Sequence, residues 1–234
     1  MNLVKEAKHV EKANTISPSA AIMAVAVTFV LTLFLGAVFI LAFGDAPALV
    51  LSVTVLFELL IIAVPFSYML LKHVDVKSYI GLDVKPKFIL RGITSGALLF
   101  LLDVFIASVL TAIIGVSQAV EESNAMLTNL SASTPGLILV IISLPLAGVC
   151  EEFMFRAFLQ NTINRRYGFI PAVIISSVAF GLFHFDPQLV YTLSMIIAGL
   201  ALGYIYHRWN SYVVSAIAHS TLNLIVLAAL LLAL

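Results

Sequence analysis

The chain has 234 residues, of which 62% are hydrophobic and 10% are charged, and its mean hydropathy is +1.14. A soluble globular domain contains about 45–50% apolar and about 25% charged residues, so this composition excludes that class. Twelve basic and twelve acidic residues give zero net charge, which excludes a basic nucleic-acid binder and a disordered polyelectrolyte, and a single cysteine excludes an intramolecular disulfide framework. The sequence therefore predicts an all-α integral membrane protein, a polytopic helix bundle.

Seven apolar runs are long enough to span a bilayer, because about 20 helical residues cross a hydrocarbon core about 30 Å thick. We expect membrane-spanning helices, in chain order, at about 20–43, 47–71, 89–116, 135–157, 168–185, 189–206 and 212–233. The ends of such runs are poorly determined by sequence, so six or eight spans also fit the pattern.

The domain organisation follows from the same pattern. Residues 1–17 are polar and predict a cytoplasmic or interfacial N-terminal segment, whereas 18–234 predict a single membrane-embedded domain. The first apolar run is longer than a signal-peptide core of about 7–15 residues and no small-residue cleavage site follows it, so we expect a retained anchor.

The charged residues predict the orientation. All basic residues fall at or near connections that share one side of the seven-span arrangement: Lys5, Lys8, Lys12, Lys72, Lys77, Lys85, Lys87, Arg91, Arg156, Arg165, Arg166 and Arg208. The charged residues in the opposite connections are all acidic: Asp45, Glu121, Glu122 and Asp186. The positive-inside rule makes the basic side cytoplasmic, so we expect a cytoplasmic N-terminus and an extracytoplasmic C-terminus in the plasma membrane of a prokaryote.

Several ionisable residues lie within the apolar runs, and each costs about 2.5–3.5 kcal/mol to insert, so they are candidates for function. At 1.5 Å per helical residue, four polar side chains lie about 16–27 Å from the level of the nearest arginines: Glu151, His184, His219 and Asn223. Three separate spans thus carry side chains of the types used in catalysis to one depth of the membrane, which we call the slab. Glu58 and Asp103 share this slab, and we interpret them as structural or cavity-lining residues.

Local spacing refines this picture. Glu152 and Arg156 are four residues apart, so they share a helix face and can form an ion pair. Glu151 points about 100° away from Glu152 and is free for another role. His219 and Asn223 are also four residues apart, so both side chains can point to the same place in the bundle. They can act there either as catalytic groups or as hydrogen-bonding groups between helices.

Three short motifs occur in order along these spans: Glu151–Arg156 reads EExxxR, Phe180–His184 reads FxxxH, and His219–Asn223 reads HxxxN. This set resembles the CPBP intramembrane proteases, the family of CAAX proteases and bacteriocin-processing enzymes that is also called ABI, and it is similar to the type II CAAX prenyl endopeptidases. The resemblance covers about residues 135–234, the expected motif-bearing core, while the N-terminal half matches only in its hydrophobic layout.

The resemblance implies an intramembrane endopeptidase. Carried over to this chain, it makes Glu151 a general base assisted by His184, with His219 and Asn223 stabilising the oxyanion, and it assigns supporting roles to Glu152, Arg156 and Phe180. Preorganised donors of this kind can contribute about 3–4 kcal/mol each. The implied partners are the bilayer and a peptide or lipid-modified protein substrate, including a prenylated one, but no nucleic acid.

Alternatives remain at this level. Glu151, His184 and His219 are chemically adequate Zn²⁺ ligands, although we favour a site without metal or other cofactor, because Asn223 is a poor zinc ligand. The sequence contains no HExxH and no Gly-x-Ser-x-Gly segment, which argues against zincin and serine designs. A non-catalytic membrane scaffold or immunity protein is a second alternative. A proton-coupled transporter is a third, but the sequence shows no repeated halves.

Overall fold

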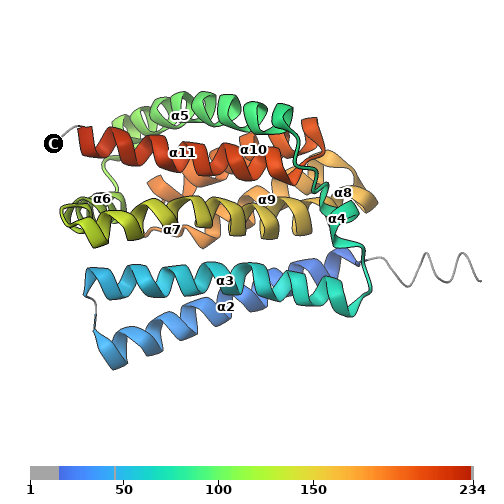
Figure 1. Cartoon of the computed structure of the whole chain (residues 1–234), viewed down its shortest axis with the longest axis horizontal. Helices are drawn as coiled ribbons and strands as arrows, with labels where there is room; N and C mark the ends of the chain where they lie inside the picture. The colour runs from blue at the N-terminus through green and yellow to red at the C-terminus, as the bar shows by residue number, and fades with distance from the viewer. Residues whose placement is uncertain (1–15, 45, 233–234) are drawn as a thin grey trace, which may run out of the picture.

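The computed structural model describes residues 16–44 and 46–232. The polar segment expected at 1–17 lies outside the described residues except for its last two positions. Every regular element in the described part is a helix, which confirms the all-α prediction (Figure 1). In chain order the helices are α2 (Pro18–Phe43), α3 (Pro47–Leu71), α4 (Val76–Ile80), α5 (Pro86–Ile114), α6 (Gln118–Ser131), α7 (Thr134–Glu152), the π-helix η1 (Phe153–Gln160), α8 (Asn161–Tyr167), α9 (Phe169–Phe183), α10 (Val190–Trp209) and α11 (Tyr212–Leu232).

Six helical segments of the described chain are long and apolar enough to cross a membrane, and α9 is a shorter apolar helix of 15 residues. The expected span at 135–157 is too short: α7, η1 and α8 run on continuously as a helix of 34 residues, Thr134–Tyr167. The prediction of about seven membrane helices therefore agrees with the fold, with α9 as the seventh. At 1.5 Å per residue α9 covers only about 22 Å, which is less than a hydrocarbon core about 30 Å thick.

The extended helix changes the position of one basic residue. Arg156 was expected at the cytoplasmic end of its span, but its side chain is fully buried in the bundle. The reason is that the helix continues for 11 more residues, to Tyr167, and polar side chains in this continuation are buried against other helices. Gln160 donates to the Gly203 carbonyl (2.8 Å), and Asn161 donates to the Tyr79 carbonyl (2.6 Å).

Helix α6 lies where the sequence suggested only a connection. Ser117 caps it by accepting from the Val120 N–H (3.3 Å), and Glu121 lies in its first turn, which suits the helix dipole. Its apolar residues Leu127 and Leu130 pack against Val140 of α7. An amphipathic helix without a continuous apolar run escapes a search for spans, so it was missed.

Close helix packing determines where α11 lies. A Cβ added to Gly92 of α5 would lie 2.6 Å from Ile217, and one added to Gly96 would lie 2.5 Å from the Ala218 carbonyl oxygen. Small residues at membrane helix interfaces let backbones approach in this way. The two glycines, one turn apart, thus hold α5 against the segment of α11 that carries His219.

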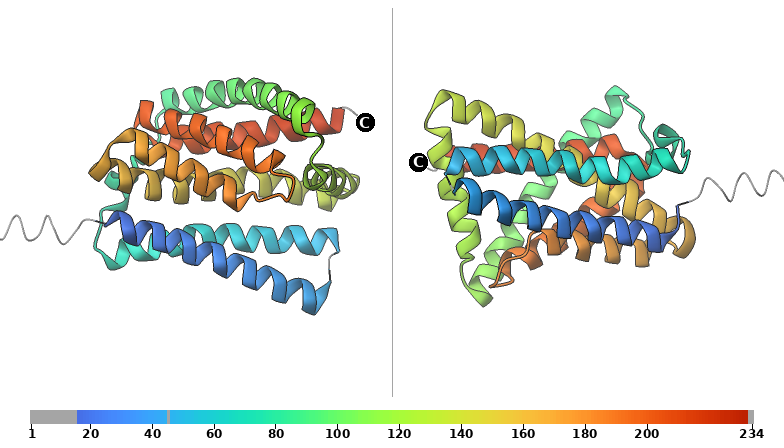
Figure 2. Two further views of the ribbon diagram at one scale, coloured as in Figure 1. Left: turned by 180° about the vertical axis from the view of Figure 1, so that it is seen from behind. Right: turned by 90° about the horizontal axis from the view of Figure 1, so that it is seen from below.

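The helices form two groups. The α2–α3 pair lies along one side, and the remaining long helices form the body of the bundle (Figures 1 and 2). Helices α4 and α8 lie at one end of the bundle and α6 lies at the other. At the α4–α8 end, the Arg91 guanidinium lies 4.0 Å from the Trp209 ring and the Arg165 guanidinium lies 4.2 Å from the Tyr79 ring. Basic residues from separate connections therefore meet at one end, as expected.

Candidate active site

Three elements bring Glu151 and two histidines together. Glu151 lies in the last turn of α7, His184 follows the last residue of α9, and His219 lies in the middle of α11. The Oε1 atom of Glu151 is 3.7 Å from the Nε2 atom of His184, and its Oε2 atom is 3.7 Å from the Nε2 atom of His219. Glu151 is only 8% exposed. The carboxylate thus lies between two imidazoles, within ion-pair distance of both and beyond direct hydrogen-bond distance.

Glu152 points in another direction and binds two partners. Its Oε1 atom lies 3.1 Å from Nη1 of Arg156 and 3.2 Å from Nδ1 of His219. Glu152 and Arg156 are fully buried, and the four-residue spacing predicted their ion pair. The contact between Glu152 and His219 joins residues 67 positions apart, and no local pattern in the sequence signals it.

The π-helix begins directly after this acid pair. All eight residues of η1, Phe153–Gln160, are buried. A π-helical segment advances the chain differently from an α-helix and is often found at functional sites. In this chain it carries Arg156 into the bundle, where Nη2 donates to the Gly199 carbonyl (3.3 Å). The Nε atom of Arg156 has no hydrogen-bond partner in the described part of the chain, so this buried cation depends on Glu152.

Phe180 connects the arginine to the histidines. Its ring is fully buried, 4.4 Å from the Arg156 guanidinium and 4.7 Å from the His184 ring. The His219 ring packs edge-on against it at 5.8 Å. The backbone carbonyl of Phe180 accepts a hydrogen bond from Nδ1 of His184 (2.9 Å). The four-residue spacing of FxxxH therefore has a structural meaning, because the first residue orients the last.

These contacts leave the two histidines in similar states. A carbonyl oxygen only accepts, so Nδ1 of His184 carries a proton and Nε2 faces Glu151. Nδ1 of His219 donates to the Glu152 carboxylate, and its Nε2 also faces Glu151. In each imidazole one nitrogen is fixed by the fold, and the other is directed at the same carboxylate.

Asn223 is placed differently from the other predicted site residues. Its Nδ2 atom donates to the Leu144 carbonyl (3.1 Å), and Ser220, one turn earlier, donates to the Pro145 carbonyl (3.0 Å). Two successive carbonyls of α7 are thus satisfied by α11. Asn223 and His219 also line one cavity, so the amide lies beside the site while it bonds to the backbone.

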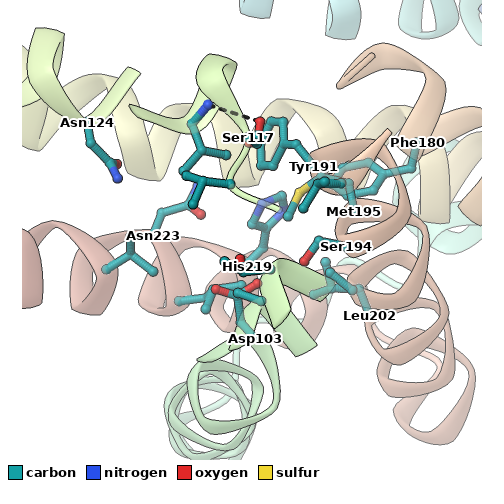
Figure 3. Close-up of a pocket in the computed structure, with 18 residues that line it drawn as sticks. Asp103, Ser117, Asn124, Phe180, Tyr191, Ser194, Met195, Leu202, His219 and Asn223 are labelled. Atoms are coloured by element: carbon teal, nitrogen blue, oxygen red, sulfur yellow. Dashed lines mark hydrogen bonds between the residues drawn. The ribbon is translucent and has the colours of Figure 1, made fainter. Parts of the chain in front are cut away.

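That cavity has a volume of about 330 Å³ and lies among α5, α6, α10 and α11. Figure 3 shows His219 and Asn223 directed into it together with Asp103 of α5, Asn124 of α6 and Ser194 of α10. Its remaining lining is mostly apolar. Glu151 and His184 do not line it, so the cavity reaches the site on the His219 side.

Two acids have unexpected surroundings. The sequence places Asp186 in an outer connection; in the structure it is fully buried, and its Oδ2 atom accepts from the Tyr191 N–H (2.6 Å) and from the Ser117 hydroxyl (3.1 Å). It thereby ties the segment after His184 to the starts of α10 and α6. Glu58 of α3 is 6% exposed, and its Oε2 atom has no hydrogen-bond partner among the described residues.

The zinc alternative concerns the same three side chains. Within residues 16–44 and 46–232, no group of three His, Cys, Asp or Glu residues is arranged to hold a metal ion. The nearest approach is Glu151 with His184 and His219, whose Nε2 atoms each lie 3.7 Å from one of its carboxylate oxygens. Cys150, beside the acid pair, is buried and free.

The fold and this site define a class: a polytopic helical membrane protein with a buried glutamate–histidine centre. The comparisons agree. Residues 132–225, which contain all three motifs, match the family model of the Rce1-like type II CAAX prenyl endopeptidases. A search of curated proteins and a search of solved structures each gave no match. Residues 132–225 therefore form a domain of the Rce1-like type II CAAX prenyl endopeptidase family.

Proposed function

We propose that this protein is an intramembrane endopeptidase in which Glu151 and His184 activate water. The family match supports a CAAX-type protease in general terms. One observation carries the finer proposal: Glu151 faces the Nε2 atoms of His184 and His219 at 3.7 Å each, while the Nδ1 atom of each imidazole is fixed by another partner. This is the arrangement of a general base between two oriented imidazoles.

The chemistry then proceeds as follows. Glu151 accepts a proton from a water molecule held between its carboxylate and Nε2 of His184, and the water oxygen attacks the carbonyl carbon of the substrate. Negative charge moves to the carbonyl oxygen, where His219 and Asn223 donate hydrogen bonds. Collapse of this intermediate breaks the C–N bond, and the leaving nitrogen takes the proton from Glu151. The products are a carboxylic acid and an amine, and transfer of the acid's proton to the amine gives a carboxylate and an ammonium group.

The buried ion pair has a supporting role in this proposal. Arg156 neutralises Glu152, and Glu152 in turn accepts a hydrogen bond from Nδ1 of His219. The proposed oxyanion role requires a proton on Nε2 of His219 as well as on Nδ1, and each of these nitrogens faces a glutamate. Phe180 holds His184 and covers Arg156. These three residues act through the histidines rather than on the substrate.

We propose a reaction without a metal, with zinc bound by Glu151, His184 and His219 as the alternative. The fixed Nδ1 atoms suit either reaction. Asn223, which lines the same cavity as His219, supports the metal-free reaction, since an amide is a poor zinc ligand. Exhaustive chelation should leave turnover within about twofold. Loss of turnover that one zinc ion per chain restores would establish the alternative.

We propose as substrate a peptide or a lipid-modified protein, including a prenylated one, in a prokaryotic plasma membrane with the basic end of the bundle in the cytoplasm. The orientation rests on the clustering of Arg91, Arg165 and Arg208 at one end. A reporter inserted near Lys77 should read as cytoplasmic, and one fused after the C-terminus as extracytoplasmic. Both reporters on the same side would contradict this topology.

The substrate can be found directly. Purified protein in proteoliposomes is incubated with prenylated and unprenylated peptide pools, and products are identified by mass spectrometry. We expect peptides cleaved by the wild-type protein but not by Glu151→Gln. Identical product patterns for the two proteins, or no cleavage by either in any pool, would count against the proposal.

A further inference from the structure

The cavity beside the site contains a carboxylate that the reaction above does not use. Asp103 lies on the face of α5 that continues from Leu99, which packs against Leu222 of α11. Ala107 and Thr111, four and eight residues after Asp103, line the cavity as well. The regular spacing shows that one face of α5 forms a wall of the cavity, and Asp103 lies on that wall (Figure 3).

Asp103 is the only acidic residue among the described residues that line the cavity, and no lysine or arginine is found with it there. Within the part of the chain that the structure describes, its carboxylate makes no ion pair and no side-chain hydrogen bond. It is half-buried and lines the cavity. A carboxylate in membrane-buried surroundings normally has a partner that compensates its charge, and this one has none among residues 16–44 and 46–232.

The surroundings of Asp103 suit a cation. Polar side chains that line the cavity with it include Asn124, Ser194 and Tyr191. Their oxygen atoms can accept hydrogen bonds from an ammonium or guanidinium group that pairs with the carboxylate. Much of the remaining wall is formed by apolar side chains such as Met195 and Leu222, which suit the aliphatic stem of such a side chain.

The cavity also reaches the site. His219 and Asn223 line it together with Asp103, and Figure 3 shows the three side chains directed into the same space from α11 and α5. A peptide whose reacting carbonyl lies against His219 would therefore place a neighbouring side chain within reach of Asp103.

We propose that Asp103 binds a lysine or arginine side chain of the substrate close to the scissile bond, and so determines specificity. This inference rests on the proposed function, which supplies the peptide. It adds a charge requirement to a substrate class otherwise defined only by its place in the membrane. Asp103 is a specificity residue and takes no part in the proton transfers.

Binding tests the inference without catalysis. Glu151→Gln protein and Glu151→Gln/Asp103→Asn protein are placed in phosphatidylcholine nanodiscs, whose lipids carry no net charge that would itself retain basic peptides. Each is incubated with a peptide pool in which lysine, arginine and norleucine alternate at each position, and retained peptides are quantified by mass spectrometry. We expect at least about fivefold enrichment of lysine or arginine over norleucine with Asp103 present, and no enrichment with the Asp103→Asn variant.

The matched control is Glu151→Gln/Asp83→Asn. Asp83 lies outside the cavity and pairs with Lys85 as an exposed ion pair, so this variant loses the same charge elsewhere. It should retain the enrichment. Equal enrichment with and without Asp103, or no enrichment in any variant, would overturn the inference.

Turnover separates this inference from the proposed function. In a chain with Glu151 intact, Asp103→Asn should raise KM about tenfold for a lysine peptide and leave the norleucine peptide unchanged, with kcat altered less than twofold for both. Cleavage without any charge preference would contradict the role of Asp103 alone. Enrichment that depends on Asp103, but without cleavage of any peptide, would contradict the proposed function and leave the cation-binding role standing.

Discussion

The α2–α3 pair and the helices from α7 to α11 use their polar side chains in opposite ways. In α2 and α3, Thr28, Ser52 and Thr54 each donate to a carbonyl four residues earlier on their own helix. In the second region some polar side chains also bond locally, as Ser177 does, but others bond across helices, as Gln160 does to α10 and Asn223 does to α7. The three hydroxyls of α2 and α3 are thus satisfied locally, whereas Gln160 and Asn223 are satisfied only when the bundle is assembled.

This difference in hydrogen bonding indicates which helices tolerate few amino-acid substitutions. A helix that satisfies its own polar groups needs only to be apolar and long enough to cross the membrane, so many different sequences can form it. A helix whose polar groups depend on distant partners tolerates few changes, because each loss leaves a buried group unpaired. The family match agrees, since it covers residues 132–225 and leaves out α2 and α3. Substitutions should therefore have large effects in the second region and small ones in the first.

The largest expected effect on stability is at Arg156. Replacing it in Arg156→Leu leaves Glu152 buried with only His219 as a partner, which should lower the free energy of unfolding by about 3–5 kcal/mol. The control is Lys85→Ala, which breaks the exposed pair with Asp83 and should cost less than about 1 kcal/mol. Equal losses in denaturant titrations of the two variants would show that the buried pair has no special importance.

Ser220 provides a matched control for the proposed oxyanion role of Asn223. Each donates to one of two successive α7 carbonyls, so Asn223→Ala and Ser220→Ala both remove one bond between α11 and α7. If Asn223 also stabilises the oxyanion, Asn223→Ala should lower kcat by about 10²–10³-fold with little change in KM. Ser220→Ala should lower kcat less than about tenfold. Similar turnover in both variants would show that Asn223 only connects α11 to α7 and does not stabilise the oxyanion.

The smallest effects are expected in α2. Phe34 is 62% exposed on the bundle surface, so Phe34→Ala should change the unfolding free energy by less than about 0.5 kcal/mol. Phe155→Ala, which removes a fully buried ring in η1, should cost about 3–5 kcal/mol. Thermal melts of the two variants in the same lipid compare them. A destabilisation by Phe34→Ala as large as that by Phe155→Ala would remove the contrast between the two regions.

The sequence predicted those features that depend on local spacing or on composition. Apolar runs predicted the membrane helices, and the four-residue spacing predicted the Glu152–Arg156 pair. Counting residues from the arginines predicted that Glu151, His184 and His219 lie at one depth of the membrane, and the structure places each histidine 3.7 Å from the Glu151 carboxylate.

Other features depend on helix rotation and on contacts between distant segments. The bond from His219 to Glu152 forms only when α11 is rotated correctly against α7, and no pattern within either helix specifies that angle. Helix α6 was missed because it lacks an apolar run, and the burial of Asp186 was not predicted because its partners, Ser117 and Tyr191, lie on two other elements. Arg156 was placed at a helix end because the burial of Gln160 beyond it is a tertiary effect.

The central claim is that Glu151 activates water at this centre, and one measurement tests it most directly. The hydrolysis rate of a cleaved peptide is compared between wild-type and Glu151→Gln protein in the same proteoliposomes, with equal thermal melts confirming that the variant is folded. The amide retains the shape and hydrogen-bonding capacity of the side chain but cannot take the proton, so turnover should fall by at least about 10³-fold. Turnover of folded Glu151→Gln protein near the wild-type rate would contradict the account.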